Sequence, residues 1–359
     1  MRVLVVGAGI IGAALADRLA RAASGGPARV TVVEAAEPGA GTSGTSYAWI
    51  NANDPTDPAY HRFRTAAMSA WRDLAAGFGD PAWYRPSGNV AWAVTDRGRE
   101  GLADRVARLT GLGYPADLIG ADRLRALEPN VAAPPGALIA HYPLEGHVHG
   151  AAAARALARR ARAAGADLVT GHRAVGLTTG GDRVTGVRLD DGRDLTADLT
   201  VCAAGRHSPA LLATAGAALA LVDPAAPGSV APCLVATTSA ARGALNGLVH
   251  APGLSARPAG SGGLVLEADD LDAGVDESAS PELVRAVGAE LLARARALVP
   301  RLTAQLTEVR RCVRPLPLDG YPLVGFQRPG LYTAVTHSGI TLAPHLAALV
   351  AHEIRTGPS

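Results

Sequence analysis

The chain has no lysine, so all 34 basic side chains among its 359 residues are arginine. Without lysine the protein cannot hold a substrate or cofactor as a lysine Schiff base. Cysteine is scarce as well, and Cys202, Cys233 and Cys312 fit neither a metal-ligand spacing nor an even disulfide framework. The sequence therefore predicts no metal site, and it suits a reducing compartment.

Long apolar runs and an excess of charge are also missing. No apolar stretch reaches the ~18 residues that span a bilayer. The net charge of +2 gives no sign of a surface for nucleic acid or an anionic membrane. The chain is too long for one ordinary core, so we expect two domains. These observations predict a cytoplasmic globular protein with no membrane span and no nucleic-acid partner, and they leave its oligomeric state open.

A glycine-rich turn follows the first apolar run. Residues 3–6 are apolar, Gly7-Ala8-Gly9-Ile10-Ile11-Gly12 comes next, and a second apolar run over 30–33 ends at Glu34. In a dinucleotide-binding turn the first glycine allows the turn, the second admits the pyrophosphate and the third lets the helix pack on the strand. An acidic residue about 20 positions further on binds the ribose hydroxyls and disfavours a 2′-phosphate. The segment therefore predicts a dinucleotide site that does not take NADP.

A signal peptide is the alternative interpretation of this N-terminus, because Met1-Arg2 precedes an apolar stretch with a small-residue site. Asp17, Arg18 and Arg21 argue against it, since they continue the pattern of an amphipathic helix. The dinucleotide turn is therefore favoured.

Other segments are candidates for the same site. The small residues of 39–46 allow close approach to a ligand, although a flexible surface loop is the alternative. Near the other end of the chain, the pattern Arg-Pro-x-x-x-Asp-Gly-x-Pro-x-x-Gly spans 314–325, and a further helix is expected to begin at Gly339-Ile340-Thr341.

With these pieces in order, the chain resembles the D-amino-acid oxidase superfamily of FAD-dependent amine oxidoreductases, in the pattern of glycine oxidase, sarcosine oxidase and D-amino-acid dehydrogenase. The glycine turn with Glu34 is shared by many flavin and nicotinamide proteins. The 314–325 pattern followed by the helix start at Gly339 is far more specific. The resemblance covers nearly the whole chain and implies FAD as the cofactor.

The expected fold is α/β, or α+β overall, with two interleaved domains. A Rossmann-like FAD-binding domain is predicted from residues 1–80, 145–216 and 305–359. An antiparallel-sheet substrate domain is predicted from residues 81–144 and 217–304. Hydrophobic periodicity predicts helices over 60–76, 97–111, 151–164 and 281–298.

The resemblance implies a place for each part of the cofactor. The glycine turn and Glu34 hold the ADP half, residues 42–44 line the pyrophosphate and the flavin edge, and residues 203–205 pass beside the cofactor. The last helix begins against the flavin, where its positive end suits the negative charge of the reduced ring. The implied cofactor-binding residues are Gly7, Gly9, Ile10, Ile11, Gly12, Glu34, Thr42, Ser43, Gly44, Ala204, Gly205, Gly339, Ile340 and Thr341.

Three residues are expected near the reacting groups. The resemblance implies that Arg314 grips a substrate carboxylate, a task that suits a planar guanidinium; a surface arginine before proline is the alternative. His337 adds a donor or a charge at the last helix, unless the backbone satisfies it as an ordinary helix-entry residue. Trp49 is expected beside the isoalloxazine, because it directly follows the small-residue loop, with a core tryptophan as the alternative.

The resemblance also has departures. Cys312 lies close to where sarcosine oxidases attach the flavin through a thioether, but a buried core cysteine, and hence non-covalent FAD, is the favoured interpretation. The lysine that promotes oxygen reaction in sarcosine oxidases is missing. The insertion with a second arginine that glycine oxidase carries after its equivalent of His337 is missing too, because Gly339 follows Ser338 at once.

We therefore expect an FAD-dependent amine or amino-acid oxidase or dehydrogenase. It oxidises the C–N bond of a small amine or amino acid by hydride transfer to flavin N5, giving an imine, and passes the electrons to oxygen or a separate acceptor. Two alternatives remain. One is a flavin-dependent tailoring enzyme or hydroxylase acting on a larger metabolite, and the other is a partner-dependent FAD-binding subunit of a dehydrogenase complex.

Overall fold

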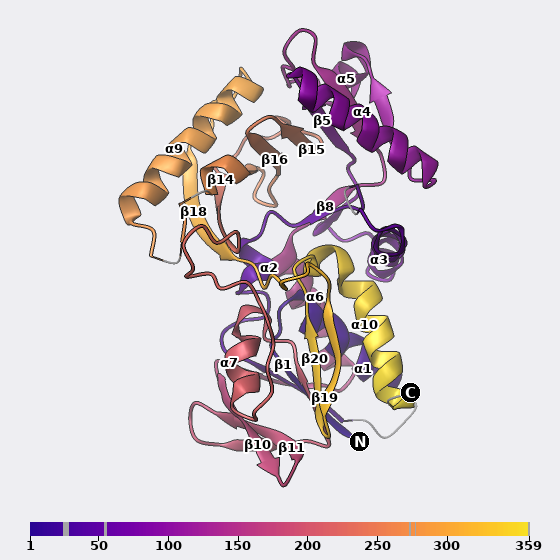
Figure 1. Cartoon of the computed structure of the whole chain (residues 1–359), viewed down its shortest axis with the longest axis vertical. Coiled ribbons are helices and arrows are strands. Elements are labelled where there is room, and N and C mark those ends of the chain that lie inside the picture. The colour runs from indigo at the N-terminus through magenta and orange to yellow at the C-terminus, as the bar shows by residue number, and fades with distance from the viewer. Residues whose placement is uncertain (24–28, 54–55, 273, 277, 358–359) are drawn as a thin grey trace. The chain divides into compact units, whose positions relative to one another are not determined.

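The computed structural model describes residues 1–23, 29–53, 56–272, 274–276 and 278–357 (Figure 1). The chain divides into two compact units, each assembled from separate segments. Unit 1 consists of Met1–Ser46, Gly150–Asp223 and Val313–Ser359, and unit 2 of Tyr47–His149 and Pro224–Cys312.

Unit 1 is built on a six-stranded sheet whose order is β19-β20-β13-β1-β2-β9. Its strands are β1 (Arg2–Val6), β2 (Arg29–Glu34), β9 (Asp167–Thr170), β13 (Leu199–Cys202), β19 (Leu323–Arg328) and β20 (Leu331–Val335). All neighbours pair in parallel except β19 and β20. The chain runs outward from β1 through β2 to β9 on one side, and through β13 to β20 on the other. The carboxyl ends of β1 and β13 therefore flank the point where open α/β sheets bind ligands.

Three helices pack together in unit 1. α1 (Ile10–Ala23) packs against both α6 (Gly150–Ala163) and α10 (Gly339–Thr356). Alanine dominates the buried face of α6, which allows a close approach to α1. Asp17 on α1 is 3% exposed and accepts two hydrogen bonds from Arg160 on α6, at 2.6 and 2.7 Å. This bidentate pair fixes the register of the two helices.

The remaining elements of unit 1 lie beside the large sheet. A three-stranded antiparallel sheet is formed by β10 (Ala174–Gly180), β11 (Arg183–Leu189) and β12 (Asp194–Thr196). Its apolar side shares a core with β1, β13 and α7 (Ser208–Ala213). Two short helical turns, α2 (Thr42–Thr45) and η1 (Gly205–His207), complete the unit.

Unit 2 contains an eight-stranded, mostly antiparallel sheet with the order β18-β14-β17-β16-β15-β5-β7-β6. Its strands are β5 (Asn89–Ala93), β6 (Asp117–Ile119), β7 (Leu138–Tyr142), β14 (Pro232–Thr238), β15 (Leu248–Ala251), β16 (Leu254–Pro258), β17 (Leu264–Glu267) and β18 (Leu306–Val313). β15 and β5 pair in parallel.

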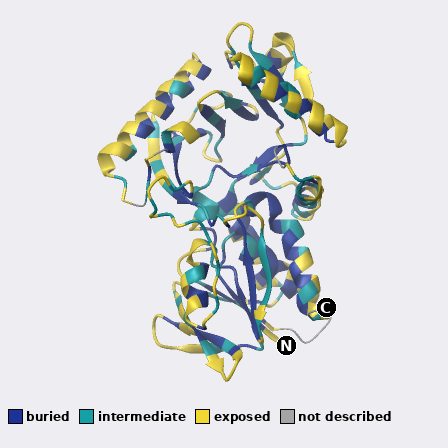
Figure 2. Ribbon diagram, in the orientation of Figure 1, coloured by how far each residue is buried: buried dark blue, intermediate teal, exposed yellow. Residues whose placement is uncertain are grey.

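The two faces of this sheet differ in chemistry. One face carries the main apolar core of the unit, together with α9 (Pro281–Leu298). Figure 2 shows α9 as buried on one side and exposed on the other. Because side chains alternate along a strand, the opposite face carries the intervening residues. That face holds a smaller apolar cluster around Tyr47 and Cys312, and also the polar residues His250 and Arg257.

A second sheet of unit 2 has the order β3-β8-β4. Its strands are β3 (Trp49–Ile50), β4 (Tyr84–Arg85) and β8 (Gly146–Val148). The helices of the unit are α3 (Pro58–Ala76), α4 (Asp96–Gly111), α5 (Ala121–Leu127), the short α8 (Asp269–Asp272) and α9. α3 starts where Asp57 accepts a 2.7 Å hydrogen bond from the Ala59 N–H, with proline at the first helical position.

The expected fold class is confirmed, since a Rossmann-like unit is interleaved with a unit built on an antiparallel sheet. The compact units divide the chain at positions that differ from the expected domain ranges. Residues 47–80 belong to unit 2, because β3 pairs with β8. Most of β18 also belongs to unit 2, as the edge strand of the eight-stranded sheet. Among the described residues, none of the helices combines the length and apolar character of a membrane span.

Candidate functional site

The glycine turn between β1 and α1 brings the strand, the helix and the turn after β13 into close contact. Gly7 has a φ of +100°, and a Cβ there would lie 2.5 Å from the Ala203 carbonyl oxygen. A Cβ on Gly12 would lie 1.9 Å from the Gly7 carbonyl oxygen, so this glycine permits the close approach of helix and strand. A Cβ on Gly9 would meet only the Ser43 Oγ, at 3.3 Å. The space beside the Gly9 backbone is thus free for a ligand, and a larger side chain at position 9 would fill that space.

Glu34 stands at the end of β2, next to this turn. Its Oε2 accepts a 2.7 Å hydrogen bond from the Ala8 N–H, and its Oε1 accepts one of 3.0 Å from the Ala36 N–H. Two backbone donors therefore fix the carboxylate, whose remaining lone pairs can accept hydroxyl groups. This is the position that the sequence assigns to the ribose contact.

Residues 42–44 lie against the same turn. The Ser43 Oγ accepts a 2.9 Å hydrogen bond from the Ile10 N–H at the start of α1, and the Thr42 Oγ1 donates one of 2.7 Å to the Val313 carbonyl. A Cβ on Gly44 would lie 2.5 Å from the Gly39 carbonyl oxygen. The small side chains of this loop thus serve close packing beside the glycine turn.

Gly150 is a member of this assembly that the sequence analysis missed. A Cβ at Gly150 would lie 2.0 Å from the Ser43 carbonyl oxygen and 3.0 Å from the Ile340 Cδ1. The first residue of α6 therefore touches both the 42–44 loop and the start of α10. In the sequence, Gly150 is visible only as a glycine at the start of an alanine-rich helix. Its role in packing could not be read there, because its neighbours Ser43 and Ile340 are distant along the chain.

The turn after β13 lies beside Gly7. The Ala203 N–H donates a 2.9 Å hydrogen bond to the Val6 carbonyl, so the two strand ends remain paired up to the turn. Ala204 precedes Gly205, whose φ is +55°. Residues 203–205 thus lie next to the glycine turn.

The start of α10 lies against the start of α1, next to the glycine turn. A Cβ on Gly339 would lie 3.5 Å from the Ile11 side chain, and Gly339, Ile340 and Thr341 are all buried. Two helix N-termini, those of α1 and α10, are therefore neighbours within unit 1. Their aligned peptide dipoles make this region favourable for anionic groups.

Arg314 and His337 also belong to unit 1. Arg314 directly follows β18, is partly buried, and its carbonyl accepts a 2.9 Å hydrogen bond from the Leu316 N–H. His337 is exposed and lies two residues before α10, with its Nδ1 3.5 Å from the Ser338 Oγ. The structure brings the residues that the sequence predicts for cofactor binding together around the glycine turn, and it places Arg314 and His337 on segments that flank β19 and β20.

Trp49 belongs to unit 2, where it contacts a buried carboxyl group. Its indole Nε1 donates a 2.9 Å hydrogen bond to Glu145, which is 0% exposed. Asn89 and the Tyr114 hydroxyl each donate a further 2.9 Å hydrogen bond to the same carboxyl. Burial, the largest effect, raises the pKa of Glu145 from 4.5 to about 7, although these donors favour the charged form.

His250 on β15 extends the same network. Its ring centroid lies 4.3 Å from that of Trp49, and its Nδ1 is 2.8 Å from the Asn89 Oδ1. Burial, followed by the charge of Arg105, lowers the pKa of His250 to about 3, so the ring is neutral. The sequence analysis missed both Glu145 and His250, because their partners are remote along the chain.

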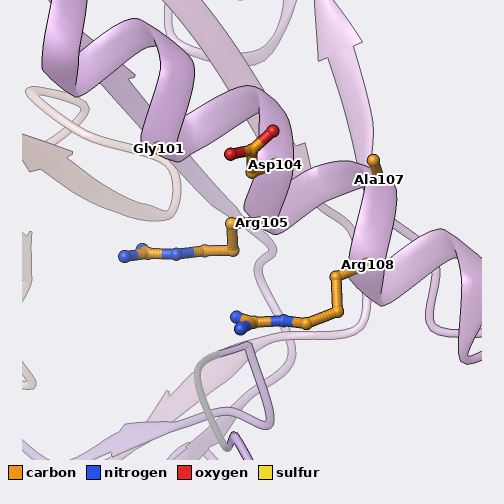
Figure 3. Close-up of a pocket in the computed structure, with 5 residues that line it drawn as sticks. All are labelled: Gly101, Asp104, Arg105, Ala107 and Arg108. Carbon is orange, nitrogen blue, oxygen red and sulfur yellow. The ribbon is translucent and has the colours of Figure 1, made fainter.

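Figure 3 shows a surface pocket on α4, lined by Gly101, Asp104, Arg105, Ala107 and Arg108. The Arg105 and Arg108 side chains extend from the helix toward the same side. None of these residues belongs to the glycine turn or to the Trp49–Glu145 network, so we assign the pocket no part in the cofactor site.

The chain matches the family model described as FAD dependent oxidoreductase (DAO) over residues 2–353. Glycine oxidase from Geobacillus kaustophilus has a similar structure, with a TM-score of 0.83 and 24% identity over 100% of this chain and 96% of that chain. Iminodiacetate oxidase from Chelativorans sp. BNC1 has a TM-score of 0.81 and 22% identity over 100% and 96%. L-proline dehydrogenase from P. horikoshii has a TM-score of 0.82 and 19% identity over 100% and 94%. No curated protein sequence matches the chain.

Proposed function

Because the chain belongs to the family of FAD-dependent oxidoreductases, we propose that it oxidises the carbon–nitrogen bond of a small amine or amino acid to an imine. Water then hydrolyses the imine. The structural neighbours support this proposal, since glycine oxidase, iminodiacetate oxidase and L-proline dehydrogenase are each named for a small amine that carries a carboxylate.

One observation in unit 1 carries the proposal. The glycine turn, the 42–44 loop and the start of α10 are in contact. The Ser43 hydroxyl accepts a hydrogen bond from the Ile10 N–H, and a Cβ on Gly339 would touch the Ile11 side chain. These groups suit FAD, because Gly9 leaves room for a pyrophosphate and Glu34 offers lone pairs to ribose hydroxyls. Bound FAD supplies a two-electron acceptor for the amine carbon.

The protein's own residues would bind and orient the substrate. We assign the carboxylate contact to Arg314, whose guanidinium can donate two parallel hydrogen bonds. The N–H groups at the start of α10 would stabilise negative charge on the cofactor, and His337 would add a donor beside them. Such a reaction depends on positioning and on exclusion of water more than on a strong base.

The absence of lysine bears on the electron acceptor. No lysine is available to promote reaction with oxygen, so we propose a dehydrogenase with a separate acceptor, or a slow oxidase. Comparing reoxidation of the reduced flavin by air and by an artificial quinone acceptor would separate the two.

An anaerobic spectral titration tests the function directly. The purified protein would be titrated with D- and L-amino acids, sarcosine and glycine while the flavin absorbance is followed. Bleaching by at least one amine is the expected result. Reduction by NADH or NADPH alone, with no amine effective, would contradict the proposal and indicate a hydroxylase.

A further inference from the structure

Nitrogen-bearing side chains gather on one face of the β3-β8-β4 sheet. His147 on β8 pairs directly with Trp49 on β3 and with Arg85 on β4. Directly opposite residues of antiparallel strands project from the same face, so these three side chains share one face of the sheet. The cluster is completed by His149, just beyond β8, whose ring centroid lies 5.3 Å from that of His147.

His147 is the clearest anomaly of this cluster. It is 1% exposed, and neither its Nδ1 nor its Nε2 has a hydrogen-bond partner. Buried polar atoms without a partner are rare and costly, so each such atom in a folded protein calls for an explanation. A ligand that reaches the ring is one such explanation.

Arg257 lies three residues before Gly260, whose Cβ position faces the His149 ring. Arg257 is 4% exposed, its Nη1 donates a 2.9 Å hydrogen bond to the Pro258 carbonyl, and its Nε donates to the Tyr47 carbonyl. Its guanidinium lies 5.5 Å from the centroid of the Tyr47 ring, which holds it in place. Among the described residues, no carboxylate forms an ion pair with it, although Glu267 on β17 acts on it at longer range. A buried guanidinium that has no ion-pair partner gains stability when an anion binds beside it.

The charge of Arg257 affects the protonation of both histidines. Burial, followed by the charge of Arg257, lowers the pKa of His147 to about 2 and that of His149 to about 4. Burial likewise lowers the pKa of Arg257 to about 10. Both imidazoles are therefore neutral, and each can donate one N–H. Arg257 contributes donors only, so the cluster favours an anionic acceptor.

His149 defines one wall of the cluster. A Cβ on Gly260, in the turn between β16 and β17, would lie 3.4 Å from three atoms of the His149 ring. The turn that carries Gly260 follows directly from Arg257 and Pro258. The histidines and the arginine are thus held by two different sheets of unit 2, which gives their arrangement rigidity.

We propose that Arg257, His147 and His149 form a binding site for the carboxylate group of a small organic acid. A guanidinium and two imidazoles match a carboxylate in charge, size and donor pattern. All three residues belong to unit 2, whereas Arg314 belongs to unit 1.

Acetate binding tests the site without any flavin reduction. Isothermal titration with acetate and with acetamide, its neutral counterpart, would use the FAD-loaded Arg314→Ala protein so that Arg314 does not contribute. Acetate should bind at least about tenfold more tightly than acetamide, because a charge-assisted hydrogen bond is lost with the neutral probe. Adding Arg257→Gln should weaken acetate about tenfold or more.

Two further variants separate binding from folding. His147→Leu removes ring nitrogens that have no partner, so it should leave the melting temperature unchanged or higher while weakening acetate several-fold. Arg285→Gln, at an exposed arginine on α9 of the same unit, should change nothing. Unaltered acetate affinity in folded Arg257→Gln or His147→Leu protein would overturn the site.

Discussion

The indole Nε1 of Trp49 donates a 2.9 Å hydrogen bond to the carboxyl group of Glu145. Glu145 is wholly buried, and its carboxyl group also accepts hydrogen bonds from the Tyr114 hydroxyl and the Asn89 amide. This single carboxyl therefore joins β3, β5 and the segment after α4. Because the His250 ring packs against Trp49 at a tilt of 37°, Glu145 orients Trp49 and, through it, supports the position of His250.

Glu145→Gln should change how stability depends on pH. The pKa of Glu145 is raised from 4.5 to about 7 in the folded protein, so folding takes up a proton between these values. Its stabilising contribution is complete below about pH 4.5, falls as the pH rises and is lost above about pH 7. Relative to Glu145→Gln, the free energy of unfolding of wild type should fall by roughly 3 kcal/mol across this interval.

Urea unfolding of the FAD-loaded proteins at several pH values measures this difference. Gln fits the site, since its carbonyl can accept from Trp49 while its amide donates to Tyr114. The exposed Glu290→Gln serves as the control and should show no such interval. Parallel stability curves for wild type and Glu145→Gln would show that Glu145 does not titrate there.

Gly9→Val should fold but purify with little flavin. The Cβ direction at Gly9 meets only the Ser43 Oγ, so the branched side chain would occupy the space that a pyrophosphate needs. The ratio of flavin to protein absorbance measures the loss. Gly101→Ala is the control, because nothing lies within 4 Å of a Cβ at this position on α4. A fully yellow Gly9→Val protein would argue against the assigned cofactor site.

Arg314→Ala should weaken substrates that carry a carboxylate by about 2–3 kcal/mol, the usual loss for a charged hydrogen-bond partner. The substrate concentration at half-maximal anaerobic flavin reduction gives the effect. Amines without a carboxylate are the control and should be unaffected. Equal kinetics in wild type and variant for every substrate would remove Arg314 from the site.

The flavin should be released in full when the wild-type protein is denatured with acid. The Cys312 side chain is 0% exposed and packs in the apolar cluster of Tyr47, Cys233, Val235, Leu248 and Val265. That setting favours a core cysteine over a thioether to the flavin. Absorbance of the supernatant after precipitation measures the release. Flavin retained on wild-type protein, but lost from Cys312→Ala, would establish the tether instead.

Much of the secondary structure of the chain can be predicted from local sequence. The helix expected over 281–298 is α9 with the same bounds, because Ser280 caps its start and proline occupies its first position. The pair Asp191-Gly192, a strong sequence signal for a hairpin, joins β11 to β12. The glycine turn was equally readable, since its conformation needs glycine at Gly7 and Gly12 whatever surrounds it. Such features depend on neighbours within a few residues.

Only the tertiary structure decided which distant residues meet. Glu145 precedes a short strand and looks in the sequence like an ordinary turn residue, yet its partners come from positions 49, 89 and 114. The same holds for His147 and Arg257, which two different sheets bring together. The sequence determined the cofactor turn, the helices and the fold class, because local backbone preferences and periodicity encode them. Burial of polar groups depends on long-range strand pairing, so the Glu145 network and the Arg257 cluster emerged only with the fold.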